Sequence, residues 1–183
     1  MTGAIEVVEY DPRWAAWFGE LATLYTVALR AVPHLAIEHV GSTSVPGLAA
    51  KPVIDVDIVV ERPHVEAAIG ALEAIGYESR GEMGIVDRWA MGAPAGSIRT
   101  NTYVVVDGSV ALHNHLAVRD ALRADGALRD EYGALKRRLA AETDDIDVYI
   151  EAKSPILQRI LAAAGLSADD RSAIEAANRP DPS

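Results

Sequence analysis

Hydrophobic positions in the first third of the chain alternate between a helical and a strand-like spacing. Behind an Asp-Pro pair at 11–12, apolar side chains recur every three or four residues to about residue 30, which predicts a helix that begins at the proline. Near-continuous apolar runs at 35–40 and 52–60 predict two strands. A second helical stripe covers residues 63–75 and ends at a glycine.

The remaining hydrophobic pattern predicts two further strands and then helices. The strands are expected at 84–92 and 97–106, on either side of a turn-prone Ala-Pro-Ala-Gly segment. Helices are expected at 110–123, 126–142 and 146–164, the last kinked or restarted at its Ser-Pro pair. This order of elements predicts an α+β domain with a mixed sheet flanked by helices, the last of them C-terminal.

The chain is expected to form one domain over residues 1–164, followed by a tail at 165–183. Its 183 residues and 50% hydrophobic content suit a single domain with a substantial core. After residue 165 the composition changes to Asp, Ala, Ser and Pro, which indicates a tail that is partly helical or disordered.

Hydropathy and charge narrow the possible environments and partners. No apolar run approaches the roughly 20 residues that span a bilayer, and the N-terminus lacks a secretion signal, so no membrane partner and a cytoplasmic location are expected. The net charge of −10 disfavours binding to bulk nucleic acid. A small phosphorylated ligand remains compatible with this charge, because a local basic cluster or a metal ion overrides the mean field. The sequence does not indicate an oligomeric state.

The strand predicted at 52–60 carries two carboxylates, Asp55 and Asp57. Alternate residues of a strand point to the same face, so both side chains should lie about 6–7 Å apart on one side of the sheet. Two close negative charges repel unless a cation lies between them, and carboxylate oxygens suit Mg²⁺ or Mn²⁺. The alternative is a solvated strand end where the aspartates cap nearby amides.

A Gly-Ser turn precedes this strand and adds groups suited to a phosphate. In Gly41-Ser42-Thr43, the glycine lets the backbone approach a ligand, and the two hydroxyls can bond phosphate oxygens. The turn followed by an apolar-Asp-apolar-Asp strand resembles the signature of the nucleotidyltransferase superfamily. That resemblance implies that Ser42 contacts a triphosphate while the aspartates hold divalent ions.

Longer blocks of the sequence are similar to the GrpB family. They are YDPRW at 10–14, IEHVGSTSVPGLAAKPVIDVDIVV at 37–60, LEAIGY at 72–77, HLAVRDALR at 115–123, YGALKRRLA at 132–140 and YIEAK at 149–153. The resemblance implies a nucleotidyltransferase-like α+β fold. Together with the superfamily signature it implies Mg²⁺- or Mn²⁺-dependent transfer of a nucleoside monophosphate from a nucleoside triphosphate to a small acceptor.

The sequence departs from the pattern of active nucleotidyltransferases on a later strand. SIRTNTYVVVDG at 97–108 has Asn101 and Tyr103 where the family tends to have an HxH pattern, and its one acid, Asp107, falls at the turn. A third carboxylate on this strand is therefore missing, and two carboxylates support two-metal catalysis less well than three. A non-catalytic module that binds a nucleotide or another phosphorylated metabolite stays open as an alternative.

Two histidines are candidates for the same cleft. His39 precedes the Gly-Ser turn, and His115 begins the HLAVRD block. A third function, metal-independent chemistry, would use both as acid and base. Equally, His39 is a candidate for a structural histidine held by hydrogen bonds.

Basic and aromatic residues elsewhere are candidates for phosphate and base contacts. Lys51 precedes the Asp strand, and Arg99 lies on the strand expected beside it. The helices carry two i,i+4 pairs, Tyr132/Lys136 and Tyr149/Lys153, each on one helical face. We expect at least two of these four cations to point into the cleft of Asp55 and Asp57. The alternative is that they are solvated side chains on half-buried helices.

Overall fold

A five-stranded mixed sheet forms the centre of the computed structural model, which describes residues 5–178. Its spatial order is β1-β2-β5-β4-β3, with β2 and β5 parallel and the other neighbours antiparallel. The strands are β1 (Ala36–Val40), β2 (Ile54–Val60), β3 (Glu78–Ser79), β4 (Arg88–Gly92) and β5 (Thr100–Val106). The predicted α+β class with a mixed sheet is confirmed.

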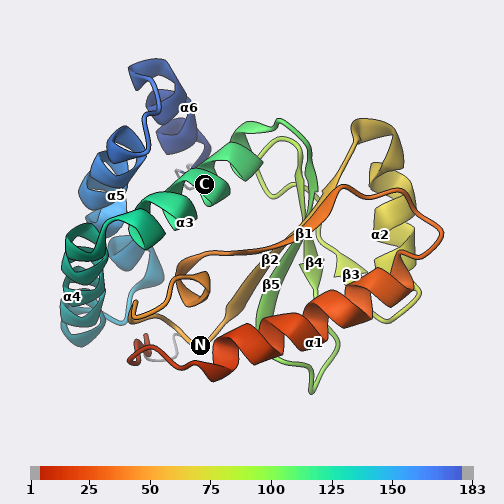
Figure 1. Cartoon of the computed structure of the whole chain (residues 1–183), viewed down its shortest axis with the longest axis horizontal. Coiled ribbons are helices and arrows are strands. Elements are labelled where there is room, and N and C mark those ends of the chain that lie inside the picture. The colour runs from red at the N-terminus through yellow and green to blue at the C-terminus, as the bar shows by residue number, and fades with distance from the viewer. Residues whose placement is uncertain (1–4, 179–183) are drawn as a thin grey trace.

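One face of the sheet is covered by α1 (Arg13–Ala28) and α2 (Val65–Glu73), as Figure 1 shows. Alternate residues of β2 point to this side because side chains in a strand alternate between faces. They pack with apolar residues of both helices into the largest core, whose β2 members are Ile54, Val56, Ile58 and Val60. These strand residues are fully buried, so this face supplies much of the hydrophobic stabilisation.

The opposite face is covered only in part. Val59 and Val105, near the ends of β2 and β5, pack against Ala111 and Leu112 at the start of α3 (Val110–Ala124). The N-terminal half of β2, which holds both aspartates, lies outside this small core. A polar site can therefore form beside a helix that is anchored by its first turn.

The C-terminal helices form a separate layer beside α3 (Figure 1), made of α4 (Gly126–Glu142), α5 (Ile146–Ala163) and α6 (Ala168–Asn178). Leu122 of α3, Tyr132 of α4 and Ile160 of α5 pack with Val45 and Leu48, which follow the Gly-Ser turn. The side chain of Arg123 also donates two hydrogen bonds to the Ser44 carbonyl, at 3.1 and 2.8 Å. The helical layer is thus docked on the loop that precedes β2. Within the described residues, no helix has the length and apolar character needed to cross a membrane.

Several element boundaries differ from the prediction. The strand expected from residue 84 begins only at Arg88, because residues 84–87 form a turn in which Asp87 has a positive φ of 66°. The two-residue strand β3 was not predicted, since so short a segment carries no periodic signal. The strands expected from residues 52 and 97 begin two and three residues later.

The C-terminal region differs from the prediction at the Ser-Pro pair and is compatible with the expected partly helical tail. The helix expected to kink or restart at Ser154-Pro155 is one element, α5, with Pro155 inside it. Residues 168–178 of the expected tail form the helix α6, which Leu166 and Ile174 attach to Leu161 of α5. The rest of the predicted tail, residues 179–183, lies outside the described residues.

Candidate functional site

Asp55 and Asp57 lie on the partly open face of the sheet, each paired with a polar residue of β5. Asp55 is in register with Asn101, and Asp57 with Tyr103. The Asn101 amide donates a hydrogen bond of 2.7 Å to Asp55 Oδ1. Burial raises the pKa of the Asp55 carboxyl above its ordinary value, and the Asn101 hydrogen bond opposes part of that rise. The position beside Asp55 that could have supplied a third carboxylate is an amide donor.

The Gly-Ser turn lies directly against Asp55. Gly41 has a φ of 67°, in the left-handed region that favours glycine, and a Cβ built on it would overlap Asp55 Oδ2. Any other residue at position 41 would therefore move either the turn or the carboxylate. The backbone of the turn and the carboxylate of Asp55 form one surface.

Asp57 is fully buried and is paired with a histidine from α3. His115 Nδ1 donates to Asp57 Oδ2 at 2.7 Å, and within the described part of the chain Asp57 Oδ1 has no partner. Burial alone would lower the pKa of His115, but the Asp57 carboxylate and its hydrogen bond outweigh burial and raise the pKa above its ordinary value. The sequence predicted that the two carboxylates need a cation, and the structure places the His115 ring beside Asp57, where the carboxylate favours the protonated form of the imidazole.

The chain has three lysines, and all three meet near Asp55. Lys51, Lys136 and Lys153 form what we call the lysine cluster, from the loop before β2, from α4 and from α5. Lys136 Nζ lies 4.6 Å from the ring centre of Tyr132, and Lys153 Nζ lies 4.3 Å from that of Tyr149. Lys51 Nζ lies 5.5 Å from the same Tyr149 ring. The two i,i+4 Tyr–Lys pairs therefore face each other across one site.

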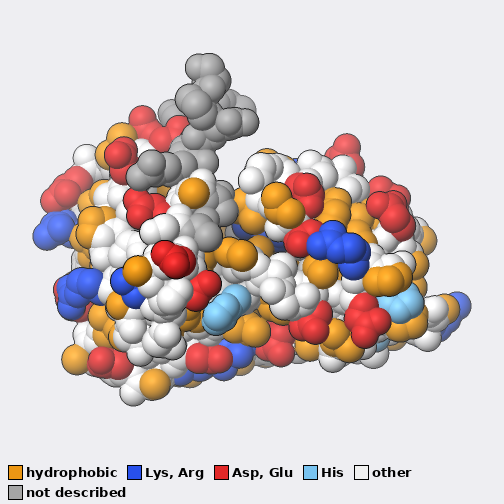
Figure 2. All heavy atoms as spheres, turned by 90° about the horizontal axis from the view of Figure 1, so that it is seen from above, with side chains coloured by type: hydrophobic (Ala, Val, Ile, Leu, Met, Phe, Trp, Pro, Cys, Tyr) orange, Lys and Arg blue, Asp and Glu red, His pale blue; other side chains and the backbone are white. Residues whose placement is uncertain are grey.

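Burial and mutual repulsion disfavour the charged form of the amines in the lysine cluster and so lower their pKa values. Burial, followed by the nearby Lys153, lowers the pKa of Lys136 to about 7. Burial, followed by Lys51, lowers the pKa of Lys153 to about 8, while Asp55 opposes both shifts. Lys136 is 3% exposed, and its Nζ has no hydrogen-bond partner among the described residues. Acidic side chains are spread over the outer face seen in Figure 2, so this internal cluster differs in sign from the protein's mean charge.

Ser42 and Tyr132 connect the turn to the lysine cluster. Burial raises the pKa of the Tyr132 phenol, with Tyr149 adding to the rise, and a hydrogen bond with Ser42 opposes it. Asp55 also acts on the same phenol. Gly41, Ser42 and the two Tyr–Lys pairs are thus brought together around Asp55.

Thr43 and His39 stabilise the turn instead of facing a ligand. The Thr43 hydroxyl, 2% exposed, donates to the Val53 carbonyl at 3.1 Å and lies 3.1 Å from His39 Nε2. Because the hydroxyl's one proton is used on Val53, His39 Nε2 must be the donor of their hydrogen bond. The His39 ring stacks on Phe18, with centroids 4.6 Å apart, and burial lowers its pKa to about 4. The structure gives no support to an acid–base role for His39 or a ligand contact for Thr43.

Comparisons with known proteins agree with this fold. The model of a family described as "GrpB protein" matches residues 4–163. The chain belongs to the GrpB family. A UPF0157 protein of Halalkalibacterium halodurans is 38% identical over 164 residues, which cover 88% of this chain and 83% of that protein. The crystal structure of GrpB from Enterococcus faecalis has a TM-score of 0.77 at 36% identity, over 87% of this chain and 96% of that one.

A more distant structural likeness extends beyond the GrpB family. The Cid1 poly(U) polymerase, in a crystal structure described as MgGTP-bound, has a TM-score of 0.52 at 14% identity, over 74% of this chain and 44% of that one. At this identity the likeness concerns the fold alone. The fold seen here is therefore similar to part of the Cid1 poly(U) polymerase structure.

Asp55 and Asp57 are the candidate metal ligands of this GrpB family member. Among the described residues, no group of three or more His, Asp or Glu side chains is arranged to hold a metal ion. Asp55 and the free Oδ1 of Asp57 remain as ligands, since Asp57 Oδ2 is used by His115. Mg²⁺ is commonly held by one or two carboxylates together with substrate phosphates and water. The donor set therefore suits an ion that arrives with a polyphosphate.

Three arginines lie near the site, and the sequence predicted only one of them as a site residue. Arg99, which the sequence singled out, is exposed and acts on the pKa of Lys51. Arg80 and Arg88 were missed, although with Arg99 they line one cavity of about 520 Å³ beside Asn101. The Arg88 guanidinium lies 4.4 Å from the ring centre of Tyr103. No sequence pattern marked either residue, because their proximity to β5 depends on the pairing of β4.

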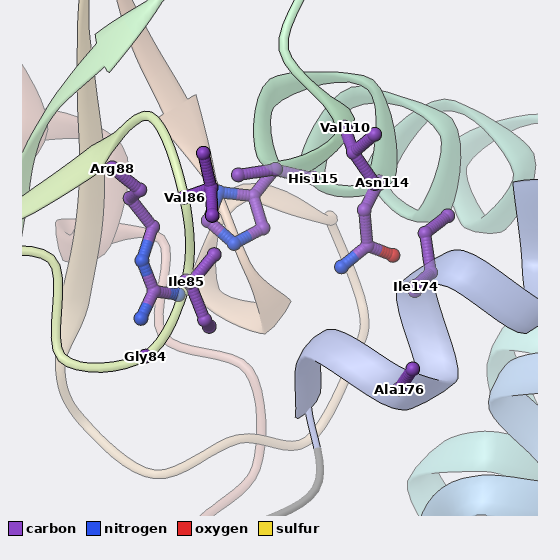
Figure 3. Close-up of a pocket in the computed structure, with 10 residues that line it drawn as sticks. Gly84, Ile85, Val86, Arg88, Val110, Asn114, His115, Ile174 and Ala176 are labelled. Atoms are coloured by element: carbon purple, nitrogen blue, oxygen red, sulfur yellow. The ribbon is translucent and has the colours of Figure 1, made fainter.

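A second cavity of about 290 Å³ lies on the other side of Arg88. Figure 3 shows Arg88 and His115 beside Ile85 and Val86, with Ile174 and other residues of α6 across the space. Its lining is mostly apolar, and its wall from α6 lies outside the residues that match the GrpB family model.

Proposed function

We propose that this GrpB family member binds a nucleoside triphosphate with Mg²⁺ and transfers its nucleoside monophosphate to a small acceptor. The observation that carries the proposal is the convergence of all three lysines on Asp55 and the Gly-Ser turn. A protein with a net charge of −10 that concentrates its lysines in one partly buried place needs an anion to offset their repulsion.

A triphosphate matches the geometry of the lysine cluster. Lys136 Nζ is buried without a partner among the described residues, so a phosphate oxygen would supply the hydrogen bond that it lacks. Ser42 and the backbone at Gly41, which has no side chain to obstruct it, lie next to Asp55 and can add further donors. The rings of Tyr132 and Tyr149 are almost fully buried beside Lys136 and Lys153, so they hold the two amines in place for a phosphate.

Asp55 and Asp57 are the residues that would hold the metal ion in this proposal. Mg²⁺ supplies neutralisation of the charge on the phosphates when bound. His115 fixes the orientation of Asp57 through its 2.7 Å hydrogen bond and leaves Oδ1 free. In the transfer, the acceptor oxygen forms a bond to the α-phosphorus, the bond from that phosphorus to the bridging oxygen breaks, and pyrophosphate leaves with the electron pair. The acceptor proton passes to water.

Asn101 favours a second candidate function, binding without transfer. The Asn101 amide donates to Asp55 Oδ1 at a place where a carboxylate would have assisted the acceptor hydroxyl. A module of this kind would hold a nucleotide or another phosphorylated metabolite in the same cleft. The related fold of the MgGTP-bound Cid1 polymerase supports nucleotide binding in both candidates and does not separate them.

Binding and turnover are measured separately to test these two functions. The four common nucleoside triphosphates are titrated with and without Mg²⁺ while thermal unfolding is followed, and pyrophosphate release is assayed with a panel of small hydroxyl compounds. A ligand at 100 times its Kd should add about 2.7 kcal/mol to the free energy of unfolding. Mg²⁺-dependent stabilisation with pyrophosphate release supports transfer, and stabilisation without release supports the binding module. If no triphosphate stabilises the protein, the transfer reaction is wrong, and the module binds no nucleoside triphosphate.

A further inference from the structure

The cavity beside Asn101 is lined by cations without a matching acid. We call it the arginine cavity, and it is formed by residues of β4, of β5 and of the segments that lead into them. Arg80, Arg88 and Arg99 line it, and no Asp or Glu does. Its volume of about 520 Å³ falls within the range of small-molecule sites.

The three arginines differ from most other described arginines because they have no anionic partner among residues 5–178. Arg119 and Arg159, for example, form ion pairs with Glu38 and Glu131. Across residues 5–178, the guanidinium groups of Arg80, Arg88 and Arg99 form no ion pair or hydrogen bond with another described side chain. The Nε of Arg88 is also buried. In an acidic protein, three unpaired guanidinium groups around one cavity indicate an anion site.

The shape of the cavity depends on a residue without a side chain. The guanidinium of Arg80 lies over Gly92, where an added Cβ would come within 2.8 Å of its Nε and Nη2. Arg88 is held from the other side by the ring of Tyr103. Two of the cations are thereby oriented by the sheet on which they lie.

The arginine cavity adjoins the aspartates on the same face of the sheet. Asn101 lines the cavity and donates directly to Asp55 Oδ1, and Tyr103 lines it in register with Asp57. Asn101 lies on one side of Asp55, in β5. The Gly-Ser turn and the lysine cluster lie on the other side. Two cationic zones, one of lysines and one of arginines, thus share Asp55 as a neighbour.

We infer that the arginine cavity is the acceptor subsite, and that the acceptor is a small hydroxyl compound bearing a phosphate monoester. This inference rests on the proposed function and names its substrate class. A phosphate monoester carries close to two negative charges and three oxygens, which suits several guanidinium donors better than a carboxylate does. With its phosphate on the arginines, the hydroxyl end faces Asp55. Its oxygen attacks the α-phosphorus, pyrophosphate leaves, and the proton passes to water.

The test uses ribose 5-phosphate, ribose and inorganic phosphate as probes of the full chain, without nucleotide or Mg²⁺. Calorimetry should detect ribose 5-phosphate and inorganic phosphate but not ribose. Arg80→Met and Arg99→Met remove charge at exposed positions while keeping an apolar stem, so folding should be preserved. Each should weaken binding of ribose 5-phosphate about tenfold or more. The matched control is Arg30→Met, an exposed arginine just after α1, which should leave this affinity unchanged.

The outcomes separate this inference from the proposed function. Failure of both phosphate probes to bind at millimolar concentration overturns the inference. So does ribose 5-phosphate binding that Lys153→Met abolishes and the arginine variants leave unchanged, because the probe then occupies the lysine cluster. If nucleoside triphosphates fail to bind but arginine-dependent binding of ribose 5-phosphate persists, the phosphate site stands and the transfer reaction falls. If pyrophosphate release occurs but both arginine variants leave phosphate binding unchanged, the transfer reaction stands and the arginine cavity is not the subsite.

Discussion

The two faces of the sheet are built from alternate residues of the same strands, but they differ in whether their buried polar groups have hydrogen-bond partners. On the side of α1 and α2, the Tyr25 hydroxyl is buried and lies 2.8 Å from the Tyr77 hydroxyl and 2.7 Å from Thr102 Oγ1. On the side of the aspartates, Asp57 Oδ1 and Lys136 Nζ are buried without a partner in the described part of the chain. One face is complete as it stands, whereas the other has unfilled hydrogen-bonding capacity.

This difference indicates which face of the sheet stabilises the fold and which face lowers the stability of the ligand-free protein. Buried polar atoms without partners cost free energy, and native proteins contain few of them. In residues 5–178 the atoms of this kind are Asp57 Oδ1, Arg88 Nε and Lys136 Nζ, and all belong to the candidate site and its arginine cavity. Their position is expected if a ligand supplies the missing partners. Variants on the two faces should therefore have opposite effects on stability and on binding.

The largest expected effect is on the α1 and α2 face. Leu72 is fully buried in the main core, so Leu72→Ala should lower the free energy of unfolding by about 2–5 kcal/mol. Urea titration measures the loss, and Leu24→Ala, which removes a leucine that is 43% exposed, is the matched control with little expected change. The affinity of the folded fraction for nucleotide should stay the same. A loss of affinity would show that the two faces are not independent.

On the aspartate face, Lys136→Met should raise the free energy of unfolding instead of lowering it. Because burial lowers the pKa of Lys136 to about 7, the folded state disfavours the charged amine that the unfolded chain keeps up to about 10.5. The variant should be more stable than the wild type by a few kcal/mol near neutral pH, on the order expected for a shift of this size. The sequence does not reveal this effect, because it depends on the burial of a lysine that is only 3% exposed.

The pH dependence distinguishes this cause from better packing. The stability of the wild type should rise between about pH 7 and pH 10, where folded Lys136 has released its proton and the unfolded chain has not. The advantage of Lys136→Met should therefore be greatest at or below neutral pH and shrink toward pH 10. Arg138→Met, on the same helix and 66% exposed, is the control. If the variant's gain in the free energy of unfolding does not depend on pH, better packing is its cause. Lys136→Met should also bind triphosphate about tenfold or more weakly than the wild type.

Local patterns predicted the parts of the molecule that depend on neighbours in sequence. The Tyr132/Lys136 and Tyr149/Lys153 pairs were found because helical geometry places residues four apart on one face. Asp55 and Asp57 were placed on one face by strand alternation. The family blocks then carried the fold class, which is confirmed.

Features that depend on sheet register or on distant contacts could not be predicted. The family block marked His115 as a candidate for the cleft, but its hydrogen bond with Asp57, 58 residues away in sequence, depends on the docking of α3. Arg80 and Arg88 reach the site through the pairing of β3 with β4 and of β4 with β5, which the sequence does not encode locally. Ile85 and Val86 looked like strand residues because they are apolar, but they line the cavity of Figure 3 instead.

A smaller change in stability is expected for Asp55→Asn, together with a complete loss of metal-dependent binding. Burial raises the pKa of Asp55, so the folded state disfavours its charge, and a neutral amide should leave the apo melting temperature unchanged or higher. The oxygen of the introduced amide can still accept from Asn101, which preserves local geometry. Mg²⁺-dependent stabilisation by triphosphate should disappear, whereas Asp107→Asn at an exposed turn should keep it. A large drop in apo stability would instead make Asp55 a structural residue.

The smallest expected effect concerns His115, and it tests whether the aspartate face carries its own cation. The Asp57 carboxylate raises the pKa of His115 despite burial, so the imidazolium contributes stability that is fully present below the ordinary pKa of 6.5 and is lost as pH rises through the raised folded value. A glutamine side chain at this position can donate a hydrogen bond to Asp57 but carries no charge. His115→Gln should therefore be less stable than the wild type by about 1 kcal/mol in mild acid, and the difference should fade at alkaline pH. His113→Gln, at an exposed position of the same helix, should show no such trend. A His115 NMR titration with a midpoint below 6.5 would mean that Asp57 is buried beside a neutral ring, and the charge balance of the site would then depend on the lysine cluster alone.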